Sequence, residues 1–522
     1  MEQRATGRRL ARSTAIFSLA TGVSRILGLV REMVASYYFG ATGKINAFTV
    51  AFQLPNLVRA LVADAALSSA FVPVFSELLE KGERKRAWRV ASTLFWLMLL
   101  GLGGLTALFM LAAPLLMRPF HPVDLNLAVG LSRVLFPIVA LLGVSGIVVG
   151  ILNSYEEFSI PALTPVFWNL AIIAGLVLGV PNAHTTDAKL YVYAASILIG
   201  TVIQVLLPMP WLRGRDDRLH LVIDWRDPAV ARTFKLMIPV TLGLGLINVN
   251  AVIDTLFASR FLDPNIAPRA IDLAFRVYML PQGMFSVAVA TVLFPSLARL
   301  ATRNDMNGFR HTVGIGLRQI AFLLVPASVA SAVLAEPMVR LLYQRGDFKP
   351  AQTPVVAAAL AAFSLGLVFN GAMLMLNRAF FSLQSNWVPT GIALGNLVIN
   401  AGLDAAFYHY GIWGIPLATS LVNIAGTAAL LVLLRRRIGR IELGETVRAV
   451  ALITVAASVL AIVAWPIWHV LDGALGRSTL AQVASLATAL AAGGAAYLIS
   501  CKALRVRELE ALLALRARAR RV

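Results

Sequence analysis

Long apolar segments recur along the whole chain and constrain its fold more than any other feature. Each has about 20 residues or more, the length that an α-helix needs to cross the hydrocarbon core of a bilayer. About fourteen such segments occur, at roughly 14–38, 46–78, 90–117, 125–152, 160–181, 189–212, 230–260, 270–298, 311–343, 352–383, 387–408, 411–434, 446–470 and 479–503. Only 14% of the residues are charged, against about a quarter in soluble domains. Disorder, a coiled coil and a soluble multidomain enzyme are thereby excluded, and we predict an all-α polytopic membrane protein.

Basic residues alternate between the two sides of these segments. Loops that follow even-numbered segments contain clusters of Lys and Arg, whereas loops that follow odd-numbered segments hold one or two basic residues each. Because cytoplasmic loops are enriched in Lys and Arg, both termini are assigned to the cytoplasm, which requires an even number of segments. The net charge of +20 reflects these loops and does not indicate nucleic acid. The clusters comprise Lys81, Arg84, Lys85, Arg86, Arg89, Arg213, Arg215, Arg218, Arg299, Arg303, Arg435, Arg436, Arg437 and Arg440.

An internal repeat divides the first twelve segments into two halves. The motif NLAIIAGL at 169–176 reappears as NLVINAGL at 396–403, an offset of 227 residues. Leu54-Pro55-Asn56 and Leu280-Pro281-Gln282 are separated by 226 residues. Because each half contains an even number of segments, the halves share one topology, as in transporters whose two parallel bundles move around a central site.

The repeat predicts four regions. Residues 1–225 form an N-terminal lobe of six helices, residues 226–440 a C-terminal lobe of six helices, residues 441–505 two extra helices, and residues 506–522 a basic cytoplasmic tail. The two extra helices have no counterpart in the repeat and therefore stand outside the lobes.

Four arginines lie inside apolar segments, where an ionisable side chain is costly and therefore indicates a functional site. Arg25 and Arg31 are in the first segment, Arg59 in the second and Arg276 in the eighth. At the repeat offset, Arg59 and Arg276 correspond to apolar residues, so helix packing does not require a charge at either position. The planar guanidinium binds phosphate oxygens through two hydrogen bonds and keeps its charge. Because we expect no equal set of acids nearby, the arginines predict a cationic cavity floor for a pyrophosphate.

Two alternatives remain open for these arginines. Ion pairs between helices, with Asp64 or Asp272, would neutralise them. Arg31 would also avoid the membrane interior if its long side chain extended to the far interface. Neither alternative would leave a cationic site.

A second polar set lies in segments seven, eleven and twelve. Asn400 and Asp404 are four residues apart and thus share one helix face, and Asp254 lies deep in segment seven. Thr419 lies one turn beyond Ile415, whose carbonyl is expected to be freed beside a proline. Oxygen ligands of this kind suit a small hard cation such as Na⁺. The alternative is a hydrogen-bonded cluster between helices, or a protonated aspartate, without an ion.

Motifs of catalysis are absent from the sequence. It contains no GxxxxGK[ST] loop, no GxSxG and no HExxH, and its only cysteine is Cys501. A lipid-processing enzyme would need such a nucleophile or metal set, and a membrane scaffold would leave the four arginines unexplained. A transporter, and not an enzyme, is therefore predicted.

The N-terminal segments resemble a known family. Ser24-Arg-Ile-Leu-Gly-Leu-Val-Arg31, Ala51-Phe-Gln-Leu-Pro-Asn-Leu-Val-Arg59 and Ser69-Ala-Phe-Val-Pro73 are similar to the signature of the MurJ/MviN lipid II flippases. Further matches, such as Tyr343-Gln-Arg-Gly-Asp-Phe348, extend over essentially the whole chain. The resemblance implies the fold of the multidrug/oligosaccharidyl-lipid/polysaccharide exporter superfamily, with the two extra helices forming a groove for the lipid tail.

The resemblance also implies roles for single residues. The family's essential arginines fall on Arg25, Arg31, Arg59 and Arg276. Some members carry an acid just before the Ala-Phe of segment two, where this chain has Asn46, so that acid's role does not carry over. The residues similar to a sodium site of some members are Asp254, Asn400, Asp404, Ile415 and Thr419.

We therefore expect a transporter that flips lipid II, the undecaprenyl-pyrophosphate-linked peptidoglycan precursor, from the inner to the outer leaflet of the cytoplasmic membrane by alternating access. Its expected partners are lipid II, membrane lipids and cell-wall polymerases, and no nucleic acid. No cofactor is expected to be required, and Na⁺ is the candidate ion. The alternatives are a flippase for another polyprenyl-linked glycan and a drug/cation antiporter of the same superfamily, although an antiporter would line its cavity with acids and aromatic residues.

Overall fold

The computed structural model describes residues 2–62, 66–439 and 443–510, and every regular element in these ranges is a helix. Its side chains are described except at 2–18, 62, 66–69, 239–240, 242–247 and 443, so the basic residues at the N-terminus, Asp64 and most of the predicted basic tail lie outside the described part. The chain divides into two compact units, residues 1–269 and 270–522. The all-α fold class is confirmed. The lobe bounds at 225 and 440 follow from the repeat and stay a prediction.

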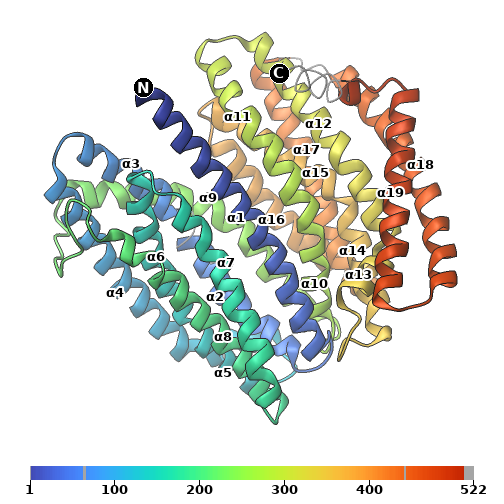
Figure 1. The fold of residues 1–522 in the computed structure, drawn as a ribbon, viewed down its shortest axis with the longest axis horizontal. Helices are drawn as coiled ribbons and strands as arrows, with labels where there is room; N and C mark the ends of the chain where they lie inside the picture. The colour runs from blue at the N-terminus through green and yellow to red at the C-terminus, as the bar shows by residue number, and fades with distance from the viewer. Residues whose placement is uncertain (1, 63–65, 440–442, 511–522) are drawn as a thin grey trace. The chain divides into compact units, whose positions relative to one another are not determined.

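The helices follow one another in the order drawn in Figure 1. The first unit contains α1 (Glu2–Phe39), α2 (Ile45–Val62), α3 (Ala66–Glu80), α4 (Arg84–Met117), η1 (Arg118–Phe120), α5 (Leu125–Leu135), α6 (Pro137–Ser154), α7 (Ser159–Ala174), η2 (Gly175–Gly179), η3 (Val180–Asn182), α8 (Thr186–Leu206), η4 (Met209–Leu212) and α9 (Pro228–Arg260). The second contains α10 (Ala267–Pro281), whose first three residues belong to the first unit, then η5 (Gln282–Ser286), α11 (Val287–Thr302), α12 (Met306–Val333), α13 (Ala335–Tyr343), η6 (Pro350–Gln352), α14 (Thr353–Leu365), α15 (Leu367–Ser382), α16 (Trp387–Phe407), η7 (Tyr408–Tyr410), α17 (Gly414–Ile438), α18 (Leu443–Leu475) and α19 (Thr479–Ala503).

Each predicted apolar segment coincides with one or two of these α-helices, in some cases with a short η element beside them. Among the described residues, 10 helical stretches are long and apolar enough to cross a membrane, and 11 if α14 and α15, bent by 43°, count as one span. The remaining three segments lie in α1, in α2 with α3, and in α9. Each includes residues whose side chains are not described, and the second also includes residues 63–65, which lie outside the described ranges. The polytopic architecture is thus confirmed, whereas the number fourteen itself is not.

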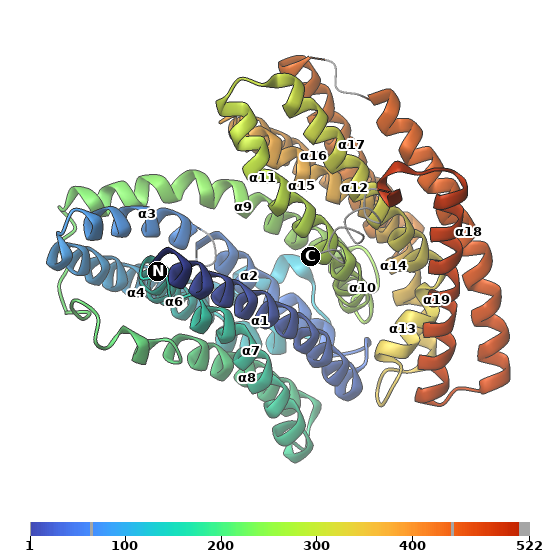
Figure 2. The ribbon, with the colours of Figure 1, turned by 45° about the horizontal axis from the view of Figure 1, so that its top comes forward.

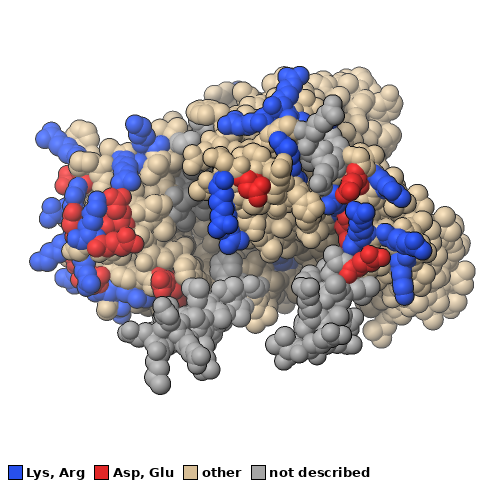
Figure 3. All heavy atoms as spheres, turned by 90° about the horizontal axis from the view of Figure 1, so that it is seen from above, with Lys and Arg blue, Asp and Glu red and all other residues tan. Residues whose placement is uncertain are grey.

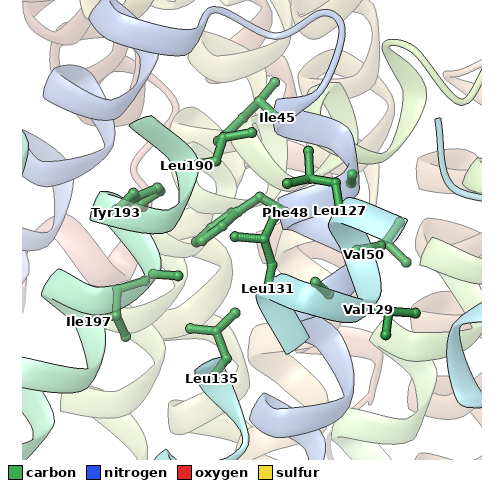
Figure 4. Packing of buried hydrophobic residues seen from close by; sticks show 14 of the residues in the cluster. Ile45, Phe48, Val50, Leu127, Val129, Leu131, Leu135, Leu190, Tyr193 and Ile197 are labelled. Atoms are coloured by element: carbon green, nitrogen blue, oxygen red, sulfur yellow. The ribbon is translucent and has the colours of Figure 1, made fainter. Parts of the chain in front are cut away.

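One core of the first unit lies where α5 contacts both α2 and α8 (Figure 4). Phe48 of α2 stacks on Tyr193 of α8 with ring centroids 4.4 Å apart, and Leu131 of α5 is fully buried beside them. Lipid is as apolar as these side chains, so close packing, and not exclusion from water, holds such helices together. This packing fixes α2, which carries Arg59.

A second core joins α3, α4, α6 and α9. Phe71 and Phe75 of α3 have ring centroids 5.1 Å apart, and Trp88 donates a hydrogen bond to the Tyr155 hydroxyl over 3.1 Å. A Cβ atom on Gly150 would lie 2.6 Å from Phe71 Cδ1. The small residue therefore lets α3 approach α6, as small residues at membrane helix interfaces commonly do.

Three loop and helix-end residues are joined at one end of the first unit. Lys44 Nζ lies 2.7 Å from Asp187 Oδ1 and 3.4 Å from Asp124 Oδ2. Asp124 also accepts a hydrogen bond from the Leu127 amide over 3.0 Å, which caps α5. That hydrogen bond and then Lys44 lower the pKa of Asp124.

This lowered pKa predicts a loss of stability in acid. A carboxyl whose pKa is lower in the folded state stabilises the fold above its unfolded pKa, which is about 3.9, and that stabilisation disappears as the pH falls through the folded pKa. We expect the thermal midpoint of Asp124→Ala to be lower than that of the wild type at pH 7 and to fall less between pH 7 and about pH 3. Asp347→Ala, at an exposed loop position, is the control and should keep the wild-type slope. If the thermal midpoints of Asp124→Ala and of the wild type fell in parallel with pH, a lowered pKa of Asp124 in the folded state would be contradicted.

In the second unit, α18 and α19 pack together and both contact α12. Phe322, Ile453 and Ala489 are buried at this junction. Tyr497 of α19 donates a hydrogen bond to the Phe322 carbonyl over 2.7 Å, and Arg340 of α13 forms an ion pair with Asp472 of α18. The two extra helices are therefore attached to the unit through α12 and α13.

Candidate functional site

Arg31 lies on α1 and is buried, with 9% of its surface exposed. Its Nη2 is 2.7 Å from Glu32 Oε1, and its Nη1 donates to Asn169 Oδ1 over 3.2 Å. The guanidinium lies 4.8 Å from the ring centroid of Trp168, a favourable cation–π distance. Trp168 and Asn169 belong to α7, so the packing of α7 on α1 orients the arginine. The alternative that Arg31 extends to the interface is wrong.

Glu32 lies between two arginines. Its Oε2 is 3.2 Å from Arg269 Nη2, and both side chains are only 2% exposed. The expectation that the arginines lack acidic partners is therefore wrong for Arg31. The reason is that Glu32, which is adjacent to Arg31 in sequence, is held inside the unit by Arg269 from the start of α10. Two guanidinium groups and one carboxylate still leave a net positive charge in this cluster, which we call the Arg31–Glu32–Arg269 cluster.

Asn46, where the chain departs from the family pattern, supports this cluster. Its Oδ1 accepts from the Arg269 amide over 2.8 Å, and its Nδ2 donates to the carbonyls of Ala41 and Gly43 over 3.0 and 3.1 Å. A carboxylate has no hydrogen to donate to these carbonyls. The amide at position 46 therefore joins the loop before α2 to the start of α10.

The other two arginines of the first unit have different surroundings. Arg59 is half-buried on α2, and its Nε and Nη2 donate to Asn56 Oδ1 over 3.1 and 3.0 Å. Asn56 belongs to the repeated Leu-Pro-Asn motif, so that motif orients the arginine. Arg25 is exposed on α1 and forms no ion pair with a described residue. Asp64, a suggested partner, lies outside the described residues.

Arg276 belongs to α10 in the second unit. Its Nε is 3.0 Å from Asp272 Oδ2, and its side chain is 30% exposed. The expectation of an unpaired arginine is thus wrong here too, because Asp272 lies one turn away on the same helix. The structure brings Arg25, Arg31 and Arg59 into one unit and places Arg276 in the other.

The helix that carries Arg276 changes its winding directly after it. α10 ends at Pro281 and continues as the π-helical turn η5, a deviation that is frequent at functional sites. Asn370 of α15 donates to the Tyr278 hydroxyl over 2.9 Å and accepts from Gln282 Nε2 over 3.4 Å. Polar side chains thus hold α15 against the break.

The predicted cation ligands are split between the units. In the second unit Asn400 and Asp404 are fully buried on one face of α16, and Asn400 Nδ2 donates to Asp404 Oδ2 over 3.0 Å. α16 packs on α17, where Thr419 Oγ1 lies 3.4 Å from the Ile415 carbonyl oxygen. Asp254 belongs to the first unit, where Asn250 Nδ2 is 3.4 Å from both of its oxygens.

The chemistry of these residues fits a small cation. Their buried oxygens include a carboxylate, an amide, a hydroxyl and a backbone carbonyl, which are ligands that hard cations prefer. Among the described residues no group of three or more His, Cys, Asp or Glu side chains is close enough to hold a metal ion. A site here would therefore depend on neutral oxygens as well as on Asp404.

Sequence reasoning missed Glu32, Arg269, Trp168 and Asn169. For two of these residues, the sequence contains a feature that could have identified them. Glu32 directly follows an intramembrane arginine, and Arg269 lies two turns before Arg276 and hence near the same face of the helix. Asn169 was noticed only as part of the repeat, and nothing in the sequence marks Trp168 as a partner of Arg31.

Comparisons with known proteins agree on one family. The family described as "Lipid II flippase MurJ" matches residues 35–499. The "Probable lipid II flippase MurJ" of Vibrio cholerae is 31% identical over 437 residues, covering 81% of this chain and 82% of the relative. The "Lipid II flippase MurJ" of Burkholderia cenocepacia is 30% identical, covering 73% and 74%.

Solved structures show the same fold. A lipid II flippase MurJ in an inward closed conformation has a TM-score of 0.78 and 24% identity, covering 95% of this chain and 99% of that one. An inward-facing multidrug resistance MATE family transporter of the MOP superfamily has a TM-score of 0.70 and 17% identity, covering 80% and 95%.

Proposed function

This chain belongs to the lipid II flippase MurJ family, and from that membership we propose how its residues serve transport. The protein is a multi-pass membrane transporter that flips lipid II by alternating access, and it is not an enzyme. The observation that carries the proposal is the buried Arg31–Glu32–Arg269 cluster, because a family relative that handles a pyrophosphate lipid needs fixed positive charge inside its bundle.

The arginines bind the pyrophosphate of lipid II in this proposal. Arg31 is oriented by Asn169 and Trp168, and Arg59 by Asn56, so little side-chain entropy remains to be lost on binding. Arg25 adds an exposed charge on the same helix as Arg31. Arg276 exchanges Asp272 for the phosphate, since a guanidinium binds the two anions with the same planar geometry.

The direction of transport is part of the proposal. We infer from the basic loops that both termini lie in the cytoplasm. We therefore propose that lipid II moves from the inner to the outer leaflet of the cytoplasmic membrane and that a cell-wall polymerase takes it over there. We propose that α18 and α19 form a groove that accommodates the lipid tail. This is supported by exposed apolar side chains on both helices, such as Ile462 at 71% and Ile499 at 68%.

Depletion of the protein tests the flippase assignment. Inner-leaflet lipid II should accumulate in depleted cells, and a membrane-impermeant enzyme that cleaves lipid II should find less substrate on intact spheroplasts than in undepleted ones. Lysed spheroplasts are the control, because both leaflets are then accessible. Equal cleavage in intact depleted and undepleted cells would contradict the proposal.

A sodium ion is proposed to bind to Asn400, Asp404, Ile415 and Thr419 of the second unit, and Asp254 stays a ligand that the sequence alone predicts. Binding to the folded state stabilises it by mass action, so replacing KCl with NaCl at equal ionic strength should raise the thermal midpoint of the purified protein. Asp404→Asn should remove the difference between the salts, whereas Asp305→Asn, at a helix cap away from these residues, should keep it. Equal midpoints in both salts would contradict a sodium site.

A further inference from the structure

The segment between α8 and α9, residues 209–227, is fastened along α4 and is called the connecting segment below. The His220 amide donates to Ser92 Oγ over 3.1 Å, and its carbonyl accepts from Trp96 Nε1 over 2.9 Å. The Asp224 amide donates to Thr93 Oγ1 over 3.0 Å. Residues 220–224 are therefore held against the face of α4 that carries Ser92, Thr93 and Trp96.

This attachment sets the level of the connecting segment relative to the membrane. α4 begins at Arg84, and at a rise of about 1.5 Å per residue Ser92 is about 12 Å along its axis. The basic part of α4 ends at Arg89, and the helix is apolar from there on. Residues 220–224 thus lie beside the first apolar turns of α4, at the level where a membrane-spanning helix passes through the lipid headgroups.

The outward side of the connecting segment is apolar and aromatic. Leu221 is 81% exposed, Ile223 46%, Trp225 66% and Trp211 42%. Leu212 is buried and Leu219 half-buried, and both belong to the core of α3, α4 and α6, so the segment divides its apolar residues between the bundle and the surroundings. Exposed tryptophans and aliphatic residues at this level are typical of segments that lie in a membrane interface.

Arginines of the connecting segment stand beside these apolar residues without an acid to neutralise them. Of its four acids, Asp216 pairs with Arg84 and Asp227 with Arg86, both on α4, and Asp217 lies 3.0 Å from His220 of the segment itself. No described residue forms an ion pair with any of the segment's own arginines. These are Arg213, Arg215, Arg218 and Arg226. With residues 84–89, the segment contains eight basic and four acidic residues, a net charge of +4.

Two of the arginines flank a hollow of about 320 Å³ that is lined by residues 210–211 and 213–215. Arg215 is placed by the Tyr155 ring, whose centroid is 5.1 Å from its guanidinium. Gly214 turns the chain with a φ of +79°, a conformation that favours glycine, and a Cβ there would meet nothing within 4 Å. Figure 3 shows Lys and Arg side chains, with Asp and Glu side chains among them, over the end of the bundle where α3 ends and α4 begins.

We propose that the connecting segment is a binding site for anionic phospholipids. The exposed tryptophans and aliphatic residues enter the boundary between headgroups and acyl chains, and Arg213 and Arg215 bind the lipid phosphate at the hollow. A neutral lipid would satisfy the apolar side but not the arginines, and an acidic protein would leave the apolar side in water. The combination of both surfaces on one short segment selects an anionic lipid.

The first test measures lipid binding to the purified full-length protein in detergent. Added phosphatidylglycerol should raise the thermal midpoint more than phosphatidylcholine does. For Arg213→Ala/Arg215→Ala, the phosphatidylglycerol concentration needed for half of this effect should rise about thirtyfold, since the two arginines near an anionic surface together contribute about 2 kcal/mol. Arg435→Ala/Arg436→Ala, two exposed arginines at the end of α17, is the matched control and should titrate like the wild type.

Two results of this titration would overturn the proposal. One is that the required phosphatidylglycerol concentration rises equally in both double variants, which would indicate a general charge effect. The other is that inorganic phosphate raises the thermal midpoint as much as phosphatidylglycerol does at the same concentration, which would indicate a site for free phosphate. The midpoint without added lipid should be the same in all variants, which shows that the fold is intact.

The second test measures depth in vesicles that contain phosphatidylglycerol. A fluorophore on Ile223→Cys, in a Cys501→Ser background, should be quenched by lipids with a spin label near the headgroup and protected from iodide in water. A fluorophore on Lys85→Cys, at the exposed start of α4, is the control. It should be quenched by iodide and not by the spin-labelled lipids. Equal quenching of both fluorophores by iodide would show that the connecting segment lies in water and would refute the lipid site. The exposed apolar residues would then be available to a protein partner.

Discussion

Loss of lipid II transport is the expected result of replacing Arg59 or Arg276 with alanine. Hydrogen bonds to a charged group contribute about 1.5–3 kcal/mol each, so losing a guanidinium that makes two of them to a phosphate should lower transport by about a hundredfold or more. Neither variant should complement a strain depleted of its own flippase. Both should insert into the membrane normally, because Arg59 is half-buried and Arg276 is 30% exposed.

The lysine variants separate phosphate geometry from charge alone. Arg59→Lys and Arg276→Lys keep the charge but not the planar pair of donors, so they should restore only a small part of the activity. Arg299→Ala is the control, since Arg299 is exposed at the end of α11, directly after the predicted segment that contains Arg276. Full activity of both alanine variants would refute the pyrophosphate site, and full activity of both lysine variants would refute the need for two donors.

A large loss of stability is expected for Glu32→Ala. The substitution leaves Arg31 and Arg269 buried without the carboxylate between them, and removing one partner of a buried ion pair costs about 3–5 kcal/mol. The thermal midpoint of the purified protein should therefore fall steeply. Lys44→Ala removes two ion pairs, with Asp124 and with Asp187, whose side chains are 30% to 43% exposed, so it should change the midpoint little.

A double variant distinguishes this explanation from simple loss of packing. In Glu32→Ala/Arg269→Met the second buried charge is removed and its volume largely kept, so part of the lost stability should return. An equally low midpoint in Glu32→Ala and in the double variant would contradict the ion-pair explanation. A wild-type midpoint in Glu32→Ala would contradict the cluster itself.

The apolar segments predicted the helices well because a membrane leaves few alternatives. A backbone in lipid must satisfy its own hydrogen bonds, so a long apolar run becomes a helix whatever its neighbours are. The repeat of Leu54-Pro55-Asn56 as Leu280-Pro281-Gln282 did not predict local geometry, because α2 continues through Pro55 whereas a π-helical turn directly follows Pro281. The same reasoning said nothing about which helices touch, because almost every face of such a helix is apolar.

Candidate charges could be found in the sequence by their cost alone. Arg31 and Arg276 stand out in apolar segments because a charged side chain in lipid is costly and therefore indicates a function. Asn400 and Asp404 stand out because their spacing places them on one helix face. What these charges contact could not be found in this way. Asp272 was considered as a partner between helices, whereas it pairs with Arg276 within one helix.

The sequence by itself determined the membrane environment, the all-helical class, the family and the positions of the candidate charges, since each depends on composition or local spacing. Only the tertiary structure decided that Arg31 is oriented by Asn169, 138 residues away, and that Glu32 is shared with Arg269, 237 residues away. Such contacts depend on how α7 packs on α1 and on where α10 begins. Helix packing in lipid depends on the shapes of whole helix surfaces, so it cannot be predicted from a local pattern of residues.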